Sequence, residues 1–349
     1  MGPSELALLR VVAQRLAGPQ PATAGEAVRW LTAVQAQDLP GALVSVALRT
    51  TSGTRADVEA ALATGELVRS WPMRGTLHLV AGEDLGWMLA LTGPRMLASI
   101  ATRRAGLGLD ASVLDRAREI AVGALTGGQA LPRRALLAQW TAAGLPTAGQ
   151  GGAHLLSHLA QTAVVCLGPM GDGGQHVVLL DEWVHRPRRL ERGQALAALV
   201  ERYLRSHGPA TVADVQRWTG LTVTDVRAGL VQVRHRLAVL EVDGVEHYLD
   251  PATPDVLAAH RRDAGRTRLL PGFDELVLGY ADRTCTVPAE FAGRVVPGGN
   301  GMFLRTVVDG GRAVGTWATT RQGSIDATPF TDFRAPVAAC LPRLHAALP

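Results

Sequence analysis

The sequence predicts an α+β fold: three tandem winged helix-turn-helix units followed by a C-terminal β-rich, barrel-like domain. Three amphipathic segments of eight residues, each ending in tryptophan, indicate an internal repeat. They are TAGEAVRW (23–30), RRALLAQW (133–140) and TVADVQRW (211–218). A longer helical pattern precedes each one, and a turn, a further helix and two alternating apolar runs follow. Three helices and a two-stranded hairpin are typical of a winged helix-turn-helix.

The third copy shows this order most clearly. Its expected elements are helices over 194–206, 211–218 and 222–236, then strands over 237–242 and 245–250. Asp243-Gly244 lies between the two alternating runs and is a strong hairpin signal. In the second copy the expected strands are 163–168 and 176–183, around a GDGG turn. The first copy is looser, with helices over 40–50 and 55–64 and strands over 66–71 and 75–80.

The repeat sets the expected domain boundaries. They are 1–106 and 107–188 for the first two winged helices, 189–258 for the third, and 259–349 for the C-terminal domain. Residues 269–349 lose helical periodicity and are expected to form short strands, including a hairpin over 305–317.

The composition excludes several chemistries. All 35 basic side chains are arginine, because the chain has no lysine, and 31 acidic side chains leave a net charge of +4 at pH 7. A phosphate-binding loop ending in lysine and a pyridoxal Schiff base are therefore excluded. The three cysteines lie far apart, so neither a zinc ribbon nor a disulfide framework is expected. No run approaches the roughly 18 apolar residues of a membrane span and the start lacks a signal-peptide layout, so we expect a cytoplasmic protein.

Two segments are rich in arginine. HRPRRLER (185–192) joins the second copy to the third, and HRRDAGRTR (260–268) follows the third copy. They are either solvated linkers or phosphate contacts, since arginine forks match phosphate oxygens. The second interpretation makes DNA-binding candidates of Arg186, Arg188, Arg189, Arg261 and Arg262. Winged helices with a basic surface favour DNA as the partner.

His154 and His158 are spaced to share one helix face. A zinc site would need a third ligand and a glutamate at position 155, where the chain has leucine. The two histidines therefore either face DNA or are satisfied in the core, and we expect no metal and no cofactor.

Four stretches resemble a known family: VQAQD (34–38), SWPMRGTLHLV (70–80), LLPGFDELVLGY (269–280) and VVPGGNGMF (295–303). On these, the chain resembles the winged-helix DNA glycosylases of the AlkZ and YcaQ type along essentially its whole length. The resemblance implies three winged helices and a β-rich part in a C-shaped body around double-stranded DNA. It also implies action on bulky N7-alkylguanine and interstrand crosslinks, often as self-resistance against DNA-alkylating antibiotics. Three repeats in one chain give no reason for a dimer, so we expect a monomer.

The catalytic signature of that family is Gln, an apolar residue, then Gln or Asp, which implies Gln35 and Gln37 as the catalytic residues. Glutamine has no useful pKa and cannot act as a general base. An N7-alkylated guanine, however, is already cationic and leaves as a neutral base. An amide oxygen that holds a water and stabilises the sugar cation is then sufficient. The alternative is two solvated or capping glutamines in a turn, and Asp38 is either a helix N-cap or a supporting group.

Supporting cations are expected in and beside the first wing, where Arg69, Arg74 and His78 could contact the sugar-phosphate near the lesion. Arg74 is the strongest of these. In the family a β-hairpin reaches toward DNA, and the 305–317 hairpin with Arg305 and Arg312 is the matching segment.

The leading hypothesis is a monofunctional DNA glycosylase for bulky N7-alkylguanine. Without lysine the chain cannot form the imine that bifunctional glycosylases use to cut the strand, so we expect no lyase activity. One alternative is a winged-helix DNA-binding regulator, which would prefer a sequence and release no base. The other is a resistance protein that binds a planar antibiotic without DNA.

Overall fold

A computed structural model describes residues 2–349 and shows a mixed α+β chain of two compact units. One unit combines the residues up to Asp57 with Leu196–Pro349, and the other is Val58–Ala195. The boundaries fall inside two helices, α4 (Arg55–Ala63) and α11 (Arg192–His207). The second unit is thus inserted into the sequence of the first.

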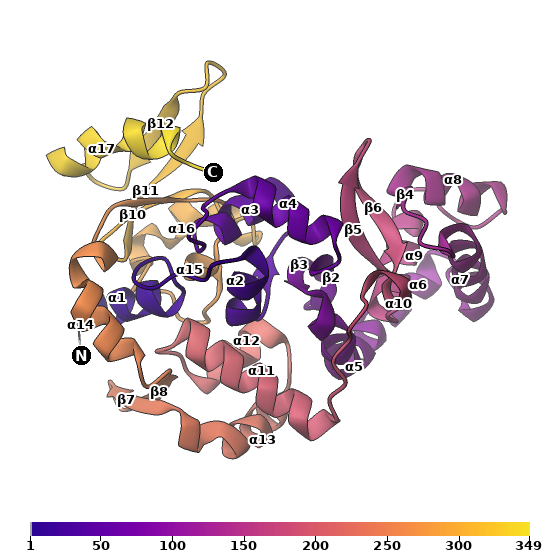
Figure 1. Cartoon of the computed structure of the whole chain (residues 1–349), viewed down its shortest axis with the longest axis horizontal. Helices are drawn as coiled ribbons and strands as arrows, with labels where there is room; N and C mark the ends of the chain where they lie inside the picture. The colour runs from indigo at the N-terminus through magenta and orange to yellow at the C-terminus, as the bar shows by residue number, and fades with distance from the viewer. Residues whose placement is uncertain (1) are drawn as a thin grey trace. The chain divides into compact units, whose positions relative to one another are not determined.

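The N-terminal part of the discontinuous unit contains α1 (Pro3–Ala13), α2 (Ala24–Leu31), β1 (Val34–Gln35) and α3 (Leu39–Ala47). Helix α2 begins with a capping box, in which Thr23 accepts from the Glu26 N–H and the Glu26 side chain accepts in return. Helix α1 packs against α14 (Thr253–Ala264), with Leu9 and Leu257 in one apolar core (Figure 1). The first and last parts of the chain therefore share a core.

The third predicted repeat lies in the same unit. After α11 come α12 (Val212–Thr219), α13 (Val223–Val233), the short 3-10 helix η1 (Arg234–Arg236), β7 (Ala238–Val242) and β8 (Val245–Leu249). Asp243 and Gly244 connect the two strands with φ of 51° and 76°. Two positive φ angles are what a type I′ turn requires, so the Asp-Gly hairpin prediction is confirmed.

The C-terminal region holds an open antiparallel sheet of order β12-β11-β10-β9. Its strands are β9 (Arg268–Leu270), β10 (Thr306–Asp309), β11 (Arg312–Thr319) and β12 (Ile325–Pro329). The predicted hairpin over 305–317 is confirmed, with Gly310 and Gly311 in its turn. Strands β9 and β12 are free edges of this sheet, so these four strands do not close into the expected barrel.

Helices interrupt this region, which the sequence predicted as strands. They are α15 (Glu275–Leu278), α16 (Ala292–Val295), the 3-10 helices η2 (Ala289–Phe291) and η3 (Pro297–Gly299), and α17 (Ala335–Ala346). Helix α17 covers the sheet, with Val337 and Leu341 packed against Val307 and Trp317 (Figure 1). The strand-only expectation for 269–349 was wrong because alanines and Pro342 obscure the helical period of α17.

The inserted unit contains two hairpins that join edge to edge. Their strands are β2 (Leu67–Met73) with β3 (Thr76–Ala81), and β5 (Val165–Gly171) with β6 (Gly174–Leu179). Arg69 on β2 pairs with Leu167 on β5, and β4 (Leu131–Pro132) adds to the far edge of β6. The second-repeat hairpin was predicted, but its last strand ends at Leu179 and the chain continues into a helix.

The helices of the inserted unit surround an apolar core. They are α5 (Gly82–Ser99), α6 (Ala101–Gly106), α7 (Ala111–Leu125), α8 (Arg133–Ala142), α9 (Gly151–Gln161) and α10 (Leu180–Trp183). Trp140 is fully buried among Leu136, Leu155 and Leu159. The 18-residue helix α5 was not predicted, because Gly93 and Pro94 interrupt its pattern. No helix within residues 2–349 is long and apolar enough to cross a membrane.

Candidate active site

The Gln-Ala-Gln motif occupies the short connection between α2 and α3. Helix α2 ends at Leu31, and the C-cap residue Thr32 has a positive φ of 73°, which turns the chain away from the helix. Gln35 lies on β1, Gln37 follows in a bend, and α3 begins at Leu39. The expected location, between the tryptophan helix and the next helix, is confirmed.

Gln35 is held from its backbone. Its N–H donates to Glu275 Oε1 over 2.8 Å, and only 8% of the residue is exposed. The side-chain Oε1 atom is buried and accepts no hydrogen bond from residues 2–349. A buried acceptor without a donor is costly, at about 1–3 kcal/mol. An unsatisfied buried acceptor in a folded protein calls for an explanation, and a catalytic role is one.

Gln37 and Asp38 differ from Gln35 in exposure. Gln37 is exposed, and Asp38 is half-buried. Asp38 stands at the N-cap position of α3, but its side chain makes no capping hydrogen bond. A Cβ atom at position 41 would lie 2.6 Å from Asp38 Oδ2, so Gly41 leaves room for the carboxylate over the first turn of α3. The Asp38 carboxylate is therefore not committed to capping the helix.

Glu275 connects the motif to two distant aromatic residues. Its Oε1 accepts from the Gln35 N–H, and its Oε2 accepts from Trp218 Nε1 over 2.9 Å and lies 3.5 Å from His207 Nε2. Burial alone would raise the pKa of Glu275, but His207, the Gln35 N–H and Trp218 together hold it below its ordinary value. A buried carboxylate thus fixes the backbone at Gln35.

Asp274 anchors α3 in the same way. Arg49 donates to both of its oxygens, from Nη1 over 2.8 Å and from Nη2 over 2.9 Å, and Ser45 Oγ donates over 2.7 Å. Both partners of this fork are fully buried. Burial opposes ionisation of Asp274, but Arg49 first and then Ser45 and the Leu276 N–H lower its pKa.

Sequence reasoning missed the roles of Asp274 and Glu275. Their signal is a pair of adjacent carboxylates inside the otherwise apolar run GFDELVLGY (272–280). Charged residues in such a run are almost always buried with partners. The sequence stretch was noticed for its resemblance, but not for these carboxylates.

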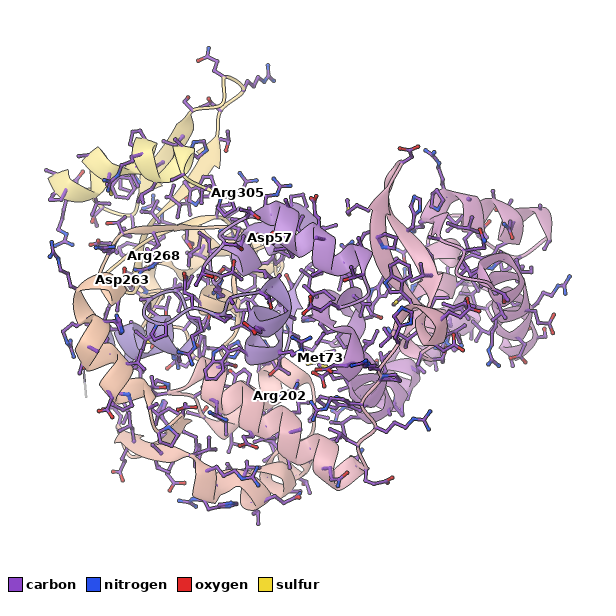
Figure 2. The ribbon with its side chains drawn as sticks, viewed as in Figure 1. Asp57, Met73, Arg202, Asp263, Arg268 and Arg305 are labelled. Atoms are coloured by element: carbon purple, nitrogen blue, oxygen red, sulfur yellow. The ribbon has the colours of Figure 1, made fainter. Side chains whose placement is uncertain are left out.

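A cavity of about 440 Å³ lies beside the motif in the same unit. Asp38 is part of its wall, and so is Arg305, one of the predicted DNA-binding residues. Figure 2 labels Arg305 among the side chains of this unit. The Arg305 guanidinium lies 5.0 Å from the centroid of the Trp317 ring. The fold thus brings Arg305 to the motif, whereas Arg312 on β11 lies half-buried outside the lining of this cavity.

Known proteins resemble this chain in sequence and in fold over most of its length. A family model described as DNA glycosylase AlkZ-like matches residues 28–348. The chain belongs to the AlkZ-like DNA glycosylase family. It is 30% identical over 335 residues to an interstrand DNA cross-link repair glycosylase of Streptomyces sahachiroi, which covers 91% of this chain and 88% of that relative. The solved structure of Streptomyces sahachiroi DNA glycosylase AlkZ matches with a TM-score of 0.81 and 25% identity, over 99% of this chain and 97% of the other.

In this AlkZ-like chain, the three candidates of the first wing lie in different surroundings. Arg69 donates from Nη1 to Gln175 Oε1 over 3.1 Å. Arg74 is exposed in the turn between β2 and β3. His78 is fully buried, with Nδ1 2.9 Å from the Thr76 carbonyl oxygen. The expectation that His78 contacts DNA is corrected, because β3 is buried on both faces at this residue.

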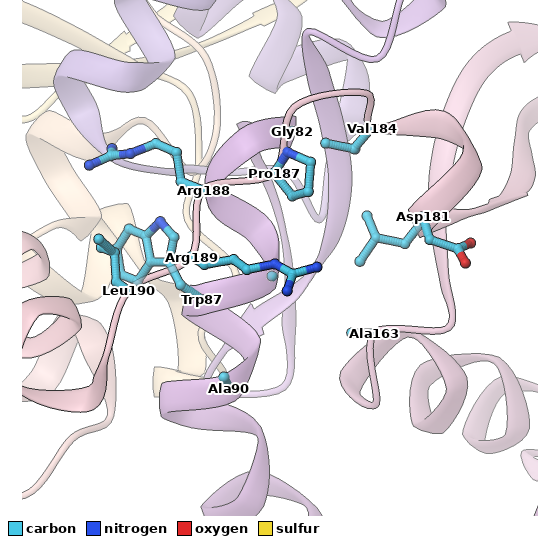
Figure 3. Close-up of a pocket in the computed structure, with 12 residues that line it drawn as sticks. Gly82, Trp87, Ala90, Ala163, Asp181, Val184, Pro187, Arg188, Arg189 and Leu190 are labelled. Carbon is cyan, nitrogen blue, oxygen red and sulfur yellow. The ribbon is translucent and has the colours of Figure 1, made fainter.

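The first arginine-rich segment remains a connection without helix up to Glu191. Arg188 donates to the buried Asp84 over 3.0 Å, so it stabilises its own unit. Arg186 and Arg189 are exposed. Arg189 lies at a second cavity, of about 390 Å³, and Figure 3 shows Arg188 and Arg189 leaving the chain in opposite directions.

The second arginine-rich segment is partly helical, since its first residues belong to the end of α14. Arg261 and Arg262 lie in the last turn of α14, and both are exposed. Arg261 donates to both carboxylate oxygens of Glu5, over 2.8 and 2.5 Å. A surface pair of this kind contributes little stability and leaves Arg261 able to exchange partners.

His154 and His158 share a face of α9, as predicted, and both are half-buried. His158 Nδ1 lies 3.2 Å from Arg104 Nη1. Burial, and then the charges of Arg103 and Arg104, lower the pKa of His154, and burial and Arg104 do the same for His158. Both rings are therefore neutral at neutral pH. Among residues 2–349, no three His, Cys, Asp or Glu side chains gather in a way that could hold a metal ion.

Proposed function

We propose that the chain is a monofunctional DNA glycosylase that hydrolyses the N-glycosidic bond of bulky N7-alkylguanine. Membership of a DNA glycosylase family supports the reaction class. One observation carries the proposal further: Gln35, in the family's Gln-apolar-Gln pattern, is fixed at its backbone by Glu275, and its buried amide oxygen accepts no hydrogen bond from residues 2–349. Gln37 is exposed, and Asp38 after it lines the cavity of about 440 Å³.

The chemistry needs positioning rather than proton transfer. Alkylation at N7 places a positive charge on guanine, so the C1′–N9 bond breaks with its electron pair on N9 and the base leaves neutral. A water held by the two amide oxygens adds to C1′, and its proton passes to solvent. The amide dipoles also face the positive charge that develops on the sugar. The products are an abasic site and a free N7-alkylguanine.

DNA binding by three winged helices is the second part of the proposal. We propose that each of the ranges 1–106, 107–188 and 189–258 forms one winged helix, with 259–349 as the C-terminal domain. Helices followed by a two-stranded hairpin in each of the three ranges support this. Exposed arginines, Arg74, Arg186, Arg189 and Arg262 among them, are the proposed phosphate contacts. We propose that the chain acts on double-stranded DNA as a monomer.

The relative from Streptomyces sahachiroi is named for interstrand cross-link repair. By this likeness we propose that the chain also unhooks crosslinks attached at guanine N7, and that it protects its host against a DNA-alkylating antibiotic. Because the chain lacks lysine, its activity stops at the abasic site.

The experiment incubates the protein with a duplex that carries one N7-alkylguanine, then cuts abasic sites with alkali. We expect cleavage with wild type and a loss of about 100-fold or more in the variant Gln35→Ala, Gln37→Ala. The matched control is Gln139→Ala, Gln232→Ala, which removes two exposed glutamines on helices and is expected to keep full activity.

Two results would contradict the proposal: no base release by wild type, or undiminished release by the Gln35 and Gln37 variant. Strand cleavage before alkali, with trapping of the protein by borohydride, would contradict the monofunctional assignment.

A further inference from the structure

The cavity beside the Gln-Ala-Gln motif has an aromatic and apolar wall. Phe273 and Phe303 lie with their ring centroids 6.1 Å apart, and Trp317 forms part of the same wall. Met302 and Leu304, on the segment between η3 and β10, are 54% and 41% exposed at its margin. Large apolar side chains that stay exposed around a concave surface mark a binding site more often than a folding element.

The size of the cavity suits a small molecule. A volume of about 440 Å³ lies within the roughly 300–1,000 Å³ that holds ligands of drug size. Aromatic rings in a cavity wall favour a planar ligand, which can stack on them or contact their edges. A planar ring system of two or three fused rings is the ligand that this wall fits.

The charges distinguish an adduct from the DNA backbone. Two carboxylates, Asp38 and Asp326, contribute to the lining. The guanidinium of Arg305 is turned to the Trp317 ring. Carboxylates repel phosphate and attract cations and hydrogen-bond donors, so Asp38 and Asp326 favour an occupant that carries donors over a phosphate of the DNA strand.

The cavity also lies next to the motif in the sequence, because one of its lining residues is adjacent to the motif. Asp38 directly follows Gln37, and the position of a Cβ atom on Gly41 would lie 3.4 Å from the Gly272 carbonyl oxygen as well as 2.6 Å from Asp38 Oδ2. The start of α3 and the loop before Phe273 are thus in close contact. A group bound in the cavity lies next to the nucleotide on which Gln35 and Gln37 act.

We propose that this cavity binds the planar aromatic part of the adduct carried on guanine N7, and so selects bulky aromatic adducts over small alkyl groups. The inference rests on the proposed glycosylase function, and it adds a specificity site made by Phe273, Phe303, Trp317 and the two carboxylates. The aromatic wall holds the ring system, and Asp38 and Asp326 accept its donors.

The test compares two duplexes, one with N7-methylguanine and one with the N7-guanine adduct of a polycyclic aromatic epoxide. Ala318 lines the cavity and is exposed, so Ala318→Trp fills the space without disturbing the core. Trp317 itself is unsuitable, since its Nε1 donates to the Leu270 carbonyl and its ring packs in the core. A second variant, Met302→Gln with Leu304→Gln, removes the exposed apolar margin.

We expect both variants to lower single-turnover release of the aromatic adduct by about tenfold or more, the range that an apolar pocket supplies. Release of N7-methylguanine is expected to stay within about twofold of wild type by the same reasoning. The matched control is Val239→Gln with Val245→Gln, which removes two exposed apolar side chains from the β7–β8 hairpin, away from the cavity lining. It is expected to leave both rates unchanged.

An equal fall on both duplexes would assign the cavity to general DNA binding and overturn the inference, as would no change on either. A calorimetric titration with the free aromatic N7-guanine base tests the cavity without catalysis. We expect binding by wild type and the control, and loss of binding in Ala318→Trp. If wild type releases neither adduct, the glycosylase proposal fails, and this titration still decides the cavity: no binding by wild type overturns it.

Discussion

Trp140 and Trp218 stand at the same place in two similar eight-residue segments, yet their indole N–H groups have different partners. Trp140 donates to the Ala117 carbonyl over 3.0 Å, within the apolar core of the inserted unit. Trp218 donates to the Glu275 carboxylate over 2.9 Å, within a network of buried charges. Trp30 resembles Trp140 in this respect, because its indole N–H also donates to a backbone carbonyl, that of Ala13. One sequence pattern therefore supports a structural contact in two copies and a contact with the candidate site in the third.

The difference extends to the surroundings. Around Trp140 the neighbours are leucines and valines. Around Trp218 they are Tyr203, His207 and Glu275. A polar network of this kind is sensitive to the loss of any one partner. The surroundings of Trp218 thus depend on charge, whereas the surroundings of Trp140 depend on apolar packing.

The largest expected effect follows from removing one partner of the deepest ion pair. Arg49→Met leaves Asp274 buried and unpaired, which is expected to lower the free energy of unfolding by about 3–5 kcal/mol. The control is Arg188→Met in the inserted unit, where the arginine is 39% exposed and Asp84 keeps its bond from Trp87. It is expected to cost about 1 kcal/mol or less. Urea unfolding measures both, and equal losses would contradict the comparison.

Glu275→Gln is expected to reduce catalysis more than binding. The amide has one acceptor oxygen for the N–H groups of Gln35 and Trp218, and its NH₂ faces the other donor. Displacement of the Gln35 backbone is expected to lower the single-turnover rate by about 10- to 100-fold, with little change in DNA affinity. Glu182→Gln is the control, because Glu182 also accepts two backbone N–H groups but is exposed. A loss of affinity without a loss of rate would show that Glu275 does not position Gln35.

The two tryptophans can be compared directly by Trp218→Phe and Trp140→Phe. Each substitution removes the same part of the indole ring, including its N–H. The difference between the two losses in unfolding free energy therefore reports how strongly each N–H binds its partner. A bond to a charged group contributes about 1.5–3 kcal/mol, and one to a carbonyl about 0.5–1.5 kcal/mol. Thermal and urea unfolding should therefore show the larger loss for Trp218→Phe. The reverse order would place the stronger bond in the inserted unit.

Acidification should weaken the charged region first. The pKa values of Asp274 and Glu275 are lowered by folding, so the stability they add is complete above their unfolded values of about 4. It is lost as the pH falls through the lower values of the folded state. In Arg49→Met, burial without a partner raises the pKa of Asp274 above its unfolded value, so the deficit against wild type should begin to shrink as the pH falls through that raised value and should continue to shrink below about pH 4. Unfolding midpoints from pH 7 to 3 measure this, and a constant deficit would contradict it.

The smallest effect is expected at His154 and His158. Both rings are neutral at pH 7 because their pKa values are lowered. Replacing each by asparagine should change DNA affinity by less than about twofold. Arg74→Gln, on an exposed turn, should weaken binding to all sequences and reduce the salt slope by about one. Affinities for an undamaged duplex, measured over a range of salt concentrations, compare these variants with wild type. A large loss of affinity in the histidine variants would show that the two rings contact DNA without carrying a charge.

Elements set by local sequence were predictable. The Asp243-Gly244 turn needs two positive φ angles that these residues adopt easily, and the capping box at Thr23 marks the start of α2. Helix α17 was missed because its apolar positions are masked by alanine and proline. Sequence periodicity detects an amphipathic face only where polar residues separate the apolar ones.

The candidate site was predictable only in part. The motif at Gln35 is local, but its support is not: 240 residues separate Gln35 from Glu275. The predicted phosphate contacts Arg188 and Arg261 have acidic partners, Asp84 and Glu5, that no local pattern indicates. The sequence shows which side chains are charged, whereas the tertiary fold decides which acidic residue each arginine contacts.

The separation of Gln35 from Glu275 also has a consequence for synthesis of the chain. On a ribosome that adds about 5–20 residues per second, 240 residues take at least about 12 s. During that time the inserted unit can fold, while the motif lacks the carboxylate that holds it. A nascent or truncated chain therefore carries the proposed catalytic glutamines without that support. The Gln35 backbone can form its hydrogen bond to Glu275 only after translation has passed the whole inserted unit.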